Sequence, residues 1–443
     1  MHRELTDLLV CPFTAAPLVL DAMETDGDEI EQGVLRGPVA EFPIVAGIAV
    51  LRGGDHDVVA ALRKGDHGTA EALAVIRDVP LSRVDALAPA LASLRPTRWL
   101  AQRLGDWQRR AAARRARAAL DLSMTDPDAL LRLTMLEQRA PNPEGYRYFS
   151  YRLGLPRHLV ALGCLTAARP GPEPVLEVGC GAGHLTWQIA SLLAPRSVLA
   201  LERELDLLWV ARRFIAPEAG LVCADARSLP VRSRSCSLGI AVDVLSFVTD
   251  KVTVVREIER VVGEDGGMIL TSLINAEACH EYAGEPLSPA QWVGLLSVPE
   301  PHLYDDAVLL DRYLRGDGPP VEWRPVDGVP RTVTVLAGRA ALEGVGSRLG
   351  RWPHAIGVLS PHPVLEQHWQ QGGDVVLRRA SPSRSFDRDN PGLDRYLTDQ
   401  VLVSAAVVAD TRAGRRSKAI DELVGELSLV GFPERCADKR WAP

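Results

Sequence analysis

The chain has 443 residues and a formal net charge of −7 at pH 7, and 47% of its residues are hydrophobic. Its length suggests about three domains, and its composition is that of an ordinary globular protein that can bury a sizeable core. The mild negative charge argues against a generally basic nucleic-acid binder, although it is compatible with a local basic patch.

The cysteines and the start of the chain bear on whether the protein is disulfide-bonded, zinc-binding, secreted or membrane-bound. The 7 cysteines include no Cys-x-x-Cys pair, so neither a disulfide framework nor a zinc site is implied. The sequence begins Met-His-Arg-Glu, without the apolar core of a signal peptide. No run approaches the ~20 apolar residues of a membrane span. We therefore expect a cytoplasmic protein without a membrane partner.

Residues 5–51 are predicted to form a small β-rich unit. Short apolar runs at residues 8–12, 17–20 and 42–51 are separated by turn formers, which is typical of short strands. This segment resembles the small zinc-ribbon proteins that activate RNA and protein methyltransferases. Those proteins carry a Cys-Pro-x-Cys knuckle and a second cysteine pair shortly before a Tyr-Pro-Ile-x-x-Gly-Ile segment.

The metal ligands of that family are mostly missing here. The chain keeps Cys11, but Thr14 stands at the second ligand position, and Leu35 and Pro38 stand near the second pair. One thiolate cannot hold tetrahedral zinc, so the resemblance implies a metal-free version of that fold, held by apolar packing. An unrelated β-rich cap is the alternative.

Residues 55–140 are predicted to be helical, because apolar residues recur at three- and four-residue spacing among Ala, Leu and Arg. Arg110, Arg114 and Arg117 fall on one stripe of such a helix. This stripe could contact RNA phosphates, and a solvated face beside acidic residues is the alternative. The Pro-Asn-Pro-Glu-Gly sequence at 141–145 then breaks the chain and marks the start of the next unit.

The stretch at residues 175–186, VLEVGCGAGHLT, organises the rest of the chain. Residues 175–178 are typical of a buried parallel strand, and a helix is predicted for residues 184–193. Between them, Gly179, Gly181 and Gly183 allow a sharp turn and the close approach of a ligand, and the helix start favours a polar or anionic group. A β-branched residue at Gly181 should therefore fill the ligand's place. Glu177 lies inside the strand, where a carboxylate is costly unless it is hydrogen-bonded or paired.

Polar residues follow the next strands at the same edge. A strand at 197–201 ends in Glu202, about 20 residues after the first glycines, where an acid can bind both hydroxyls of a ribose. A strand at 221–224 ends in Asp225 and Ala226, and that Asp suits an adenine amino group. Further strands are predicted at 238–242 and 268–273, with a helix at 253–262 that carries an apolar stripe.

Taken together, Glu177-x-Gly179-x-Gly181-x-Gly183, Glu202, Asp225-Ala226 and the strand after Gly266-Gly267 resemble the motif set of class I S-adenosylmethionine-dependent methyltransferases. The resemblance covers residues 146–273 and implies an α/β, Rossmann-like domain with S-adenosylmethionine as cofactor. The implied cofactor-binding residues are Tyr151, Glu177, Gly179, Cys180, Gly181, Gly183, Glu202, Arg203, Asp225, Ala226, Asp243 and Val244. A nicotinamide-dependent dehydrogenase is the alternative, but it expects Gly-x-Gly-x-x-Gly, and here the third glycine comes one residue early.

Two segments beside this motif set bear on the acceptor. A helix that begins at residues 146–152, just before the first core strand, offers Tyr and Arg side chains to the methionine carboxylate or the substrate; packing on the core is the alternative. The segment after the 238–242 strand, Asp243-Val244-Leu245-Ser246, lacks the Asn/Asp-Pro-Pro-aromatic turn of enzymes that methylate base amino groups. Its absence disfavours that reaction class.

A polar and aromatic stretch follows the 268–273 strand, where an acceptor pocket usually forms. Its members are Asn275, His280, Glu281, Tyr282, Pro286, Trp292 and His302. His280 is the candidate general base, since an imidazole with a pKa near ~6.5 can take a proton at neutral pH. A surface or capping role is the alternative, and many methyltransferases need no base because positioning supplies much of the rate. Residues 331–337 and 355–359 are predicted as the final strands.

The C-terminal hundred residues form a separate α+β extension. A strand is predicted at 374–379, an amphipathic segment at 390–409, and a capped helix from 415 that ends near 431–433. This order faintly resembles the winged-helix units that hold leader peptides in ribosomal-peptide biosynthesis; a dimerisation or lid element, and so a homodimer, is the alternative. The predicted units are residues 1–54, 55–140, 141–345 and 346–443.

The leading hypothesis is a methyltransferase that acts on an oxygen or nitrogen of a natural product, either a small molecule or a ribosomally made peptide. Methylation of tRNA or rRNA is the second hypothesis, suggested by the N-terminal resemblance and the arginine stripe. A non-catalytic module that binds the cofactor as a scaffold is the third.

Overall fold

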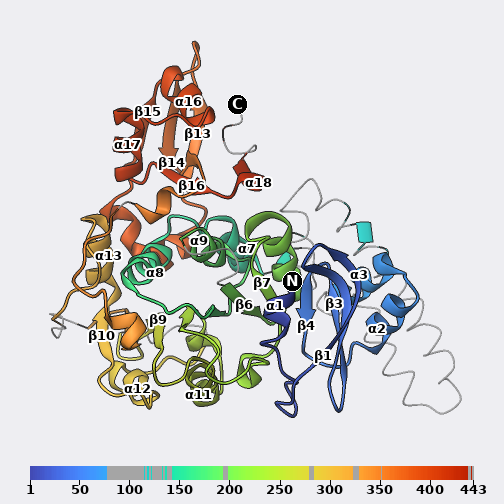
Figure 1. Cartoon of the computed structure of the whole chain (residues 1–443). Helices are drawn as coiled ribbons and strands as arrows, with labels where there is room; N and C mark the ends of the chain where they lie inside the picture. The colour runs from blue at the N-terminus through green and yellow to red at the C-terminus, as the bar shows by residue number, and fades with distance from the viewer. Residues whose placement is uncertain are drawn as a thin grey trace, which may run out of the picture.

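The computed structural model describes residues 1–76, 142–192, 198–278, 284–322, 329–350, 352–437 and 441, with a few positions between 114 and 136. Within these residues, a sheet of 11 strands runs through the molecule in the order β1-β2-β3-β4-β7-β6-β5-β8-β9-β11-β10 (Figure 1). No helix in this described part has both the length and the apolar character needed to cross a bilayer.

The middle of the sheet is parallel. Its strands are β5 (Val175–Val178), β6 (Val198–Glu202), β7 (Gly220–Cys223), β8 (Leu238–Val242) and β9 (Gly267–Ile274). The chain adds β6 and β7 on one side of β5, then crosses to add β8 and β9 on the other. This reversal between β5 and β8 is the topological switch point at which ligands of such sheets bind. The predicted α/β, Rossmann-like fold is therefore confirmed, with strand boundaries close to those expected.

Helices cover both faces of this sheet, because successive residues of each buried strand point to opposite sides. One core joins α8 (Pro156–Ala167), α9 (His184–Leu192), α10 (Leu205–Val210) and α13 (Asp306–Leu314) to the strand residues on one face. A second core joins α11 (Lys251–Val262), α12 (Pro289–Gly294) and the start of the chain to the other face. The predicted helices after β5 and before β9 are thus confirmed.

The far edge of the sheet differs in part from expectation. The predicted strand at 331–337 is β11 (Thr332–Gly338), which runs antiparallel to β9. The outermost strand is β10 (His302–Asp305), which we missed because an edge strand with His and Asp lacks an apolar run. The expected last strand at 355–359 was wrong: Pro353–Ala355 form a single 3-10 turn, and β12 (Val358–Pro361) pairs with β16 (Leu429–Phe432) in a separate sheet.

The N-terminal strands continue the central sheet. β1 (Val19–Asp26), β2 (Glu29–Arg36), β3 (Glu41–Val45) and β4 (Ile48–Val50) form an antiparallel meander, and β4 then pairs in parallel with β7. The β1–β2 hairpin was missed because most of β1 is exposed and polar. The strand expected at 8–12 was wrong, since only isolated bridges to Val231 and Pro17 form there.

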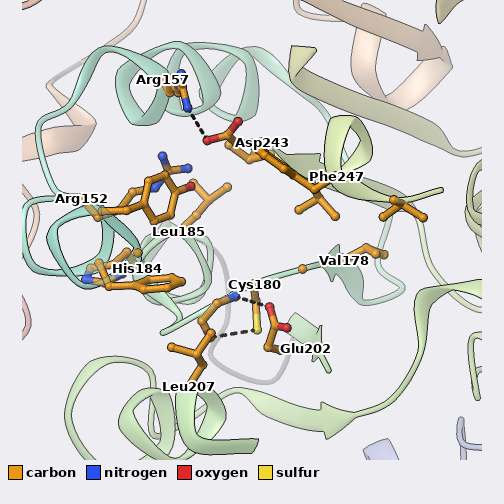
Figure 2. A pocket seen from close by; sticks show the side chains of 18 of the residues that line it. Arg152, Arg157, Val178, Cys180, His184, Leu185, Glu202, Leu207, Asp243 and Phe247 are labelled. Atoms are coloured by element: carbon orange, nitrogen blue, oxygen red, sulfur yellow. Dashed lines mark hydrogen bonds and ion pairs between the residues drawn. The ribbon is translucent and has the colours of Figure 1, made fainter. Parts of the chain in front are cut away.

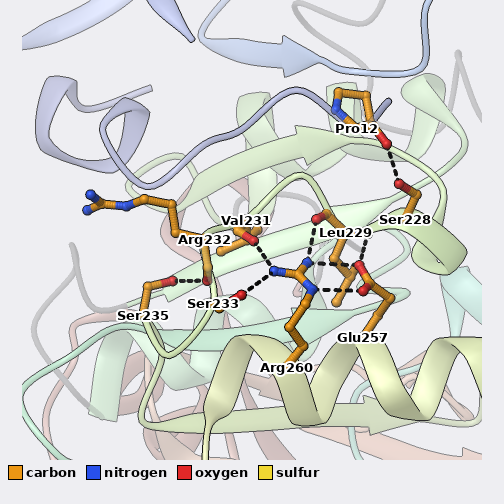
Figure 3. A network of polar contacts seen from close by, with 9 residues as sticks. All are labelled: Pro12, Ser228, Leu229, Val231, Arg232, Ser233, Ser235, Glu257 and Arg260. Carbon is orange, nitrogen blue, oxygen red and sulfur yellow. Dashed lines mark hydrogen bonds and ion pairs between the residues drawn. The ribbon is translucent and has the colours of Figure 1, made fainter. Parts of the chain in front are cut away.

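Polar contacts fasten the N-terminal segment to the sheet (Figure 3). The Ser228 hydroxyl donates a hydrogen bond to the Pro12 carbonyl at 2.5 Å. Arg260, on α11, pairs with Glu257 at 2.7 Å and donates to the Val231 carbonyl at 2.8 Å. Arg260 therefore holds the loop after β7 on which the start of the chain rests.

The C-terminal region has its own small sheet and core. β13 (Leu365–Trp369), β14 (Val375–Arg379) and β15 (Gln400–Val403) form an antiparallel sheet (Figure 1). Residues of α15 (Arg384–Asp389), α16 (Ala405–Arg412) and α17 (Lys418–Gly425) join it in a separate apolar cluster. The predicted strand at 374–379 and the capped helix are confirmed. The helix ends earlier than expected, however, because residues 429–432 pair as β16. Tyr396 joins this region to the start of α8 by donating to the Gly154 carbonyl at 2.6 Å.

Candidate cofactor and acceptor site

A cavity of about 1510 Å³ lies at the carboxyl ends of β5, β6, β7 and β8, across the switch point. Figure 2 looks into it, with Arg152 and His184 on one side and Phe247 on the other. Pockets for one small ligand usually measure ~300–1000 Å³. This cavity therefore has room for more than one ligand.

Two glycines shape the loop after β5. Gly179 and Gly181 have φ angles of +72° and +55°, which favour glycine. A Cβ on Gly179 would lie 2.3 Å from a methyl of Val244, and one on Gly181 would lie 2.5 Å from the Phe149 ring. A β-branched residue at Gly181, expected to fill the ligand's place, would therefore also collide with the Phe149 ring. Gly183 packs against Ala211 at the start of α9.

Glu177 is buried in β5, with 3% of its surface exposed. The Thr186 hydroxyl donates a hydrogen bond to it at 2.5 Å. Burial raises the pKa of Glu177 to about 7, and the Thr186 hydrogen bond and the Arg152 charge oppose that shift only in part. The partner that a buried acid requires is thus provided from α9.

Glu202, at the end of β6, is bound to main-chain groups. Its carboxylate accepts hydrogen bonds from the N–H groups of Gly181 at 3.0 Å and Arg203 at 2.7 Å. Burial raises the pKa of Glu202. This acid therefore ties the glycine loop to the neighbouring strand, and ribose hydroxyls would share it with the main chain. Cys180 is buried beside it, whereas the Arg203 side chain points outward and pairs with Glu204 at 2.8 Å.

Asp225 follows β7 and is engaged by an arginine that the sequence did not single out. Arg227 donates from its backbone N–H at 2.9 Å and from Nη2 at 2.6 Å to the Asp225 carboxylate. The hydrogen bond from Arg227 is the main cause that lowers the pKa of Asp225. Asp225, Ala226 and Arg227 all border the cavity.

Asp243, at the end of β8, has a strained backbone and a buried ion pair. Its φ is +59°, and its Oδ2 accepts a hydrogen bond from Arg157 Nη1 at 2.6 Å (Figure 2). Only 3% of the Asp243 side chain and 14% of the Arg157 side chain are exposed. Its Oδ1 is buried and has no hydrogen-bond partner among the described residues. Val244 follows it and packs over Gly179.

The helix α7 (Pro143–Ser150) covers the cavity, but Tyr151, the residue predicted to bind the cofactor from this segment, does not line it. Tyr148 and Phe149 line the cavity, whereas Tyr151 packs on Phe386 with ring centroids 5.6 Å apart. α7 ends at Ser150, so Tyr151 has left the helical phase that faces the cavity. The expectation of a single helix before β5 was also wrong, because α8 intervenes.

Arg152 is a second group that faces the cavity from this segment. It is 6% exposed, and its guanidinium lies 4.6 Å from the centroid of the Tyr148 ring. Its Nη1 is buried and lacks a hydrogen-bond partner in the described part of the chain. Burial raises the pKa of Tyr148, and the negative charge of Asp243 nearby raises it further.

The opposite wall comes from segments far along the chain. Phe247, Val329 and Arg331 line it together with Phe386 and Asp389 of the α15 segment. Arg331 pairs with the Asp389 carboxylate at 3.6 Å, and Arg157 donates to the Asp389 carbonyl at 3.3 Å. These contacts place α15 over the cavity, and no local sequence signal could have revealed them.

The candidate base His280 lies outside the described residues, as do Glu281 and Tyr282. Other members of the same polar stretch have structural contacts. The Asn275 amide donates to the Pro330 carbonyl, the Trp292 indole donates to the Ile274 carbonyl, and His302 bonds to Tyr304. These three residues do not line the cavity, whereas Ala278 of the same stretch does.

Comparison with known proteins agrees with this geometry. The protein family described as "Methyltransferase domain" matches residues 176–270. The chain is 31% identical over 141 residues to a malonyl-[acyl-carrier protein] O-methyltransferase of a Marinomonas species, which covers 31% of this chain and 50% of the relative. It is 26% identical over 117 residues to the same enzyme of a Methylovorus species, covering 25% and 40%. The chain thus spans about half the length of these curated relatives, or less.

Among solved structures, the chain is similar to a methyltransferase of Thermotoga maritima, with 15% identity and a TM-score of 0.31, covering 44% of this chain and 94% of that one. A chain from the complex of the Haloferax volcanii Trm112 activator with a methyltransferase has 16% identity and a TM-score of 0.34, with the same coverage. The domain match and the glycine loop favour a methyltransferase over the nicotinamide-dependent dehydrogenase. Residues 176–270 of the chain are thus similar to a methyltransferase domain.

Proposed function

We propose that this protein transfers a methyl group from S-adenosylmethionine to an oxygen or nitrogen of a natural-product acceptor, either a small molecule or a ribosomally made peptide. One observation carries the proposal. The cavity does not stop at the strand ends that would hold the cofactor but continues to a wall built from Phe247, Val329 and Phe386. An acceptor with apolar surface would lie there, next to the cofactor and away from water.

The strand ends suit the cofactor in chemistry and in shape. The positive φ of Gly179 and Gly181 exposes main-chain atoms to a ligand. Glu202 would accept from ribose hydroxyls, and Asp225 and Ala226 would flank the adenine. Arg152 offers a guanidinium nitrogen that lacks a partner in the described part of the chain, and a carboxylate such as that of the methionine group would satisfy it.

When bound, the cofactor supplies a methyl group on a positively charged sulfur, and the carbon–sulfur bond breaks with its electron pair retained by sulfur. The chain's own residues would orient the acceptor and exclude water. Phe149 and Phe247 contribute apolar surface on two sides of the cavity. Alignment of the acceptor with the methyl group would supply much of the rate.

The curated relatives support transfer to oxygen, since they are named for O-methylation of a malonyl group on a carrier protein. The arginines at the rim favour a small or peptide acceptor over RNA. Arg203, Arg227 and Arg388 are each within 4 Å of a carboxylate of the protein, which weakens the field available to phosphates.

We also propose that residues 1–54 are a metal-free version of the zinc-ribbon activator fold that supports the sheet. Cys11, the remaining ligand position, is 1% exposed and packs in the apolar core shared with β7. Its neighbours there are aliphatic and aromatic side chains, which suits a packing role for the thiol.

Calorimetry and mass spectrometry would test the proposed function. The purified full chain is titrated with S-adenosylhomocysteine, and we expect one binding site per chain. The protein is then incubated with S-adenosylmethionine and an extract of the host's metabolites, and the products are searched for the added mass of one CH₂. Absence of binding would overturn the proposal, whereas binding without any transfer would favour the scaffold hypothesis.

A further inference from the structure

We propose that Asp243 meets the reacting group of the acceptor, and that this group carries a proton: a hydroxyl or an amine rather than a carboxylate. The inference rests on the proposed function and names the acceptor chemistry of the same site. Asp243 was expected to bind the cofactor. The inference instead assigns one of its carboxylate oxygens to the acceptor.

The position of Asp243 is the first observation. β8 pairs with β5 across the switch point, with Ala241 opposite Val178. Asp243 therefore leaves the sheet beside the glycine loop, and the next residue, Val244, packs over Gly179. From there the cavity wall continues through Phe247. Asp243 thus lies between the strand ends that would hold the cofactor and the cavity wall built from Phe247, Val329 and Phe386.

The strain and the support of Asp243 are the second observation. Non-glycine residues rarely adopt a φ of +59°, and such strain is concentrated at functional sites. The backbone N–H of Asp243 donates to the Thr271 carbonyl at 3.1 Å. Arg157 fixes Oδ2 from α8 at 2.6 Å. The carboxylate is therefore held in one orientation from two directions.

The unused oxygen of Asp243 is the third observation. Oδ1 is buried without a hydrogen-bond partner among the residues described, although the residue lines the cavity. An ionised carboxylate only accepts hydrogen bonds, so a ligand group that satisfies Oδ1 must donate one. A hydroxyl or an amine can do so. A carboxylate acceptor would bring a second negative charge and leave Oδ1 unsatisfied.

The proton balance of the transfer follows from this contact. With a hydroxyl acceptor, an oxygen lone pair forms the new bond to the methyl carbon, and the hydroxyl proton passes to Asp243, which becomes neutral and later releases it to solvent. With an amine acceptor, nitrogen forms the bond and keeps its proton, and the resulting ammonium pairs with the Asp243 carboxylate. The positive charges of Arg152 and Arg157 favour the opposite choice, a carboxylate, so an experiment can separate the two.

Three probes with one carbon skeleton test the inference: phenylpropanol, phenylpropylamine and phenylpropionate, each with the ring at the far end of the chain. The phenyl ring suits the wall formed by Phe247 and Phe386. Their affinities are measured by NMR titration against full-length protein saturated with S-adenosylhomocysteine. We expect the alcohol and the amine to bind at least ~10-fold more tightly than the propionate, as a hydrogen bond to a charged group implies.

Asp243→Asn sharpens this test. Arg157 would hold the amide oxygen, the amide NH₂ would face the acceptor, and the propionate should become the tightest probe. Asp311→Asn, at an exposed acid outside the cavity that pairs with Arg395, is the control and should keep the wild-type order. A wild-type preference for the propionate, no binding of any probe, or an unchanged order in a folded Asp243→Asn variant would each overturn the inference. Failure of the wild type to bind S-adenosylhomocysteine would instead count against the proposed function.

Discussion

The two halves of the cavity are built in different ways. The half beside β5, β6 and β7 comes from residues close together in the chain, and main-chain groups hold it: Glu202 accepts from the N–H of Gly181 and of Arg203. The half beyond β8 joins distant segments through side chains. Ser385 on α15 donates to Glu144, 241 residues earlier, and Arg331 pairs with Asp389.

This difference indicates which half can change most easily. A loop held by N–H groups and positive φ angles depends on the backbone, so few substitutions preserve it. A wall held by ion pairs and aromatic contacts can exchange its side chains while the sheet stays intact. We expect the first half to keep one ligand and the second half to set the acceptor. The matched domain, residues 176–270, includes the first half but not α15.

The largest effect should come from Gly179→Val in the backbone-held half. Its φ is +72°, and a Cβ would lie 2.3 Å from Val244. We expect a loss of about 2–4 kcal/mol in the free energy of unfolding, from backbone strain and overpacking. Calorimetry should show affinity for S-adenosylhomocysteine reduced at least ~100-fold, as the steric block implies.

Gly65→Val is the matched control for that variant. Gly65 has a φ of +71°, and a Cβ there meets no described atom within 4 Å. The free energy of unfolding of this variant should fall only by the cost of backbone strain, about 1–2 kcal/mol. Its affinity for S-adenosylhomocysteine should not change. Full affinity in Gly179→Val would contradict the backbone-held description of this half.

The next effect concerns the side-chain-held half. Arg157→Met would leave the Asp243 carboxylate buried without its cation, and we expect a loss of about 3 kcal/mol in unfolding free energy, measured with urea. Adding Asp243→Asn should restore at least about 1 kcal/mol, because the stranded charge is gone. Arg395→Met is the control: Arg395 pairs with Asp311 at 2.8 Å, but both are more than 40% exposed, so the loss should stay below about 1 kcal/mol. Equal losses of unfolding free energy in Arg157→Met and Arg395→Met would contradict the claim that the buried Arg157–Asp243 pair holds this half.

The sequence was informative wherever function follows a local pattern. An apolar run that breaks into glycines fixed the position of the loop after β5, and acids at the ends of the next strands identified Glu202 and Asp225. These residues are set by the alternation and ends of buried strands, which are visible in a few consecutive positions. Their lining of the cavity agrees with the expectation, while their contacts with the cofactor stay a prediction.

The other half could not be predicted in this way, because its contacts join residues with no shared pattern. No sequence pattern near Arg157 indicates that it pairs with Asp243, and none near Asp389 indicates that this residue lines the cavity. The first helix places Tyr148 at the cavity, whereas Tyr151, the aromatic residue expected there, lies just beyond the end of that helix and does not line it. Helix ends, which decide such a phase, are poorly fixed by local sequence.

A pH-dependent effect of intermediate size should come from Glu177→Gln. The native pKa of Glu177 is raised by burial from 4.5 to about 7. The unfolded chain therefore ionises first, and the wild type loses stability as the pH rises from about 4.5 to about 7. Between pH 4.5 and pH 8 the variant should gain about 2–3 kcal/mol relative to the wild type in denaturant unfolding. Parallel pH profiles for the two proteins would show that Glu177 is ionised in the native state throughout.

The smallest effect should come from Ser385→Ala, where the two halves meet. The Ser385 hydroxyl of α15 donates to Glu144 of α7 at 2.8 Å, and this contact is exposed. Glu144 keeps its pairing with Arg147 at 2.8 Å, so the variant should lose no more than about 0.5 kcal/mol in unfolding free energy. If the halves are built independently, calorimetry will show affinity for S-adenosylhomocysteine changed by less than about twofold, since the loop after β5 is held by its own main chain. A change of about tenfold or more would mean that α15 reaches the cofactor through α7, and that the two halves act as one unit.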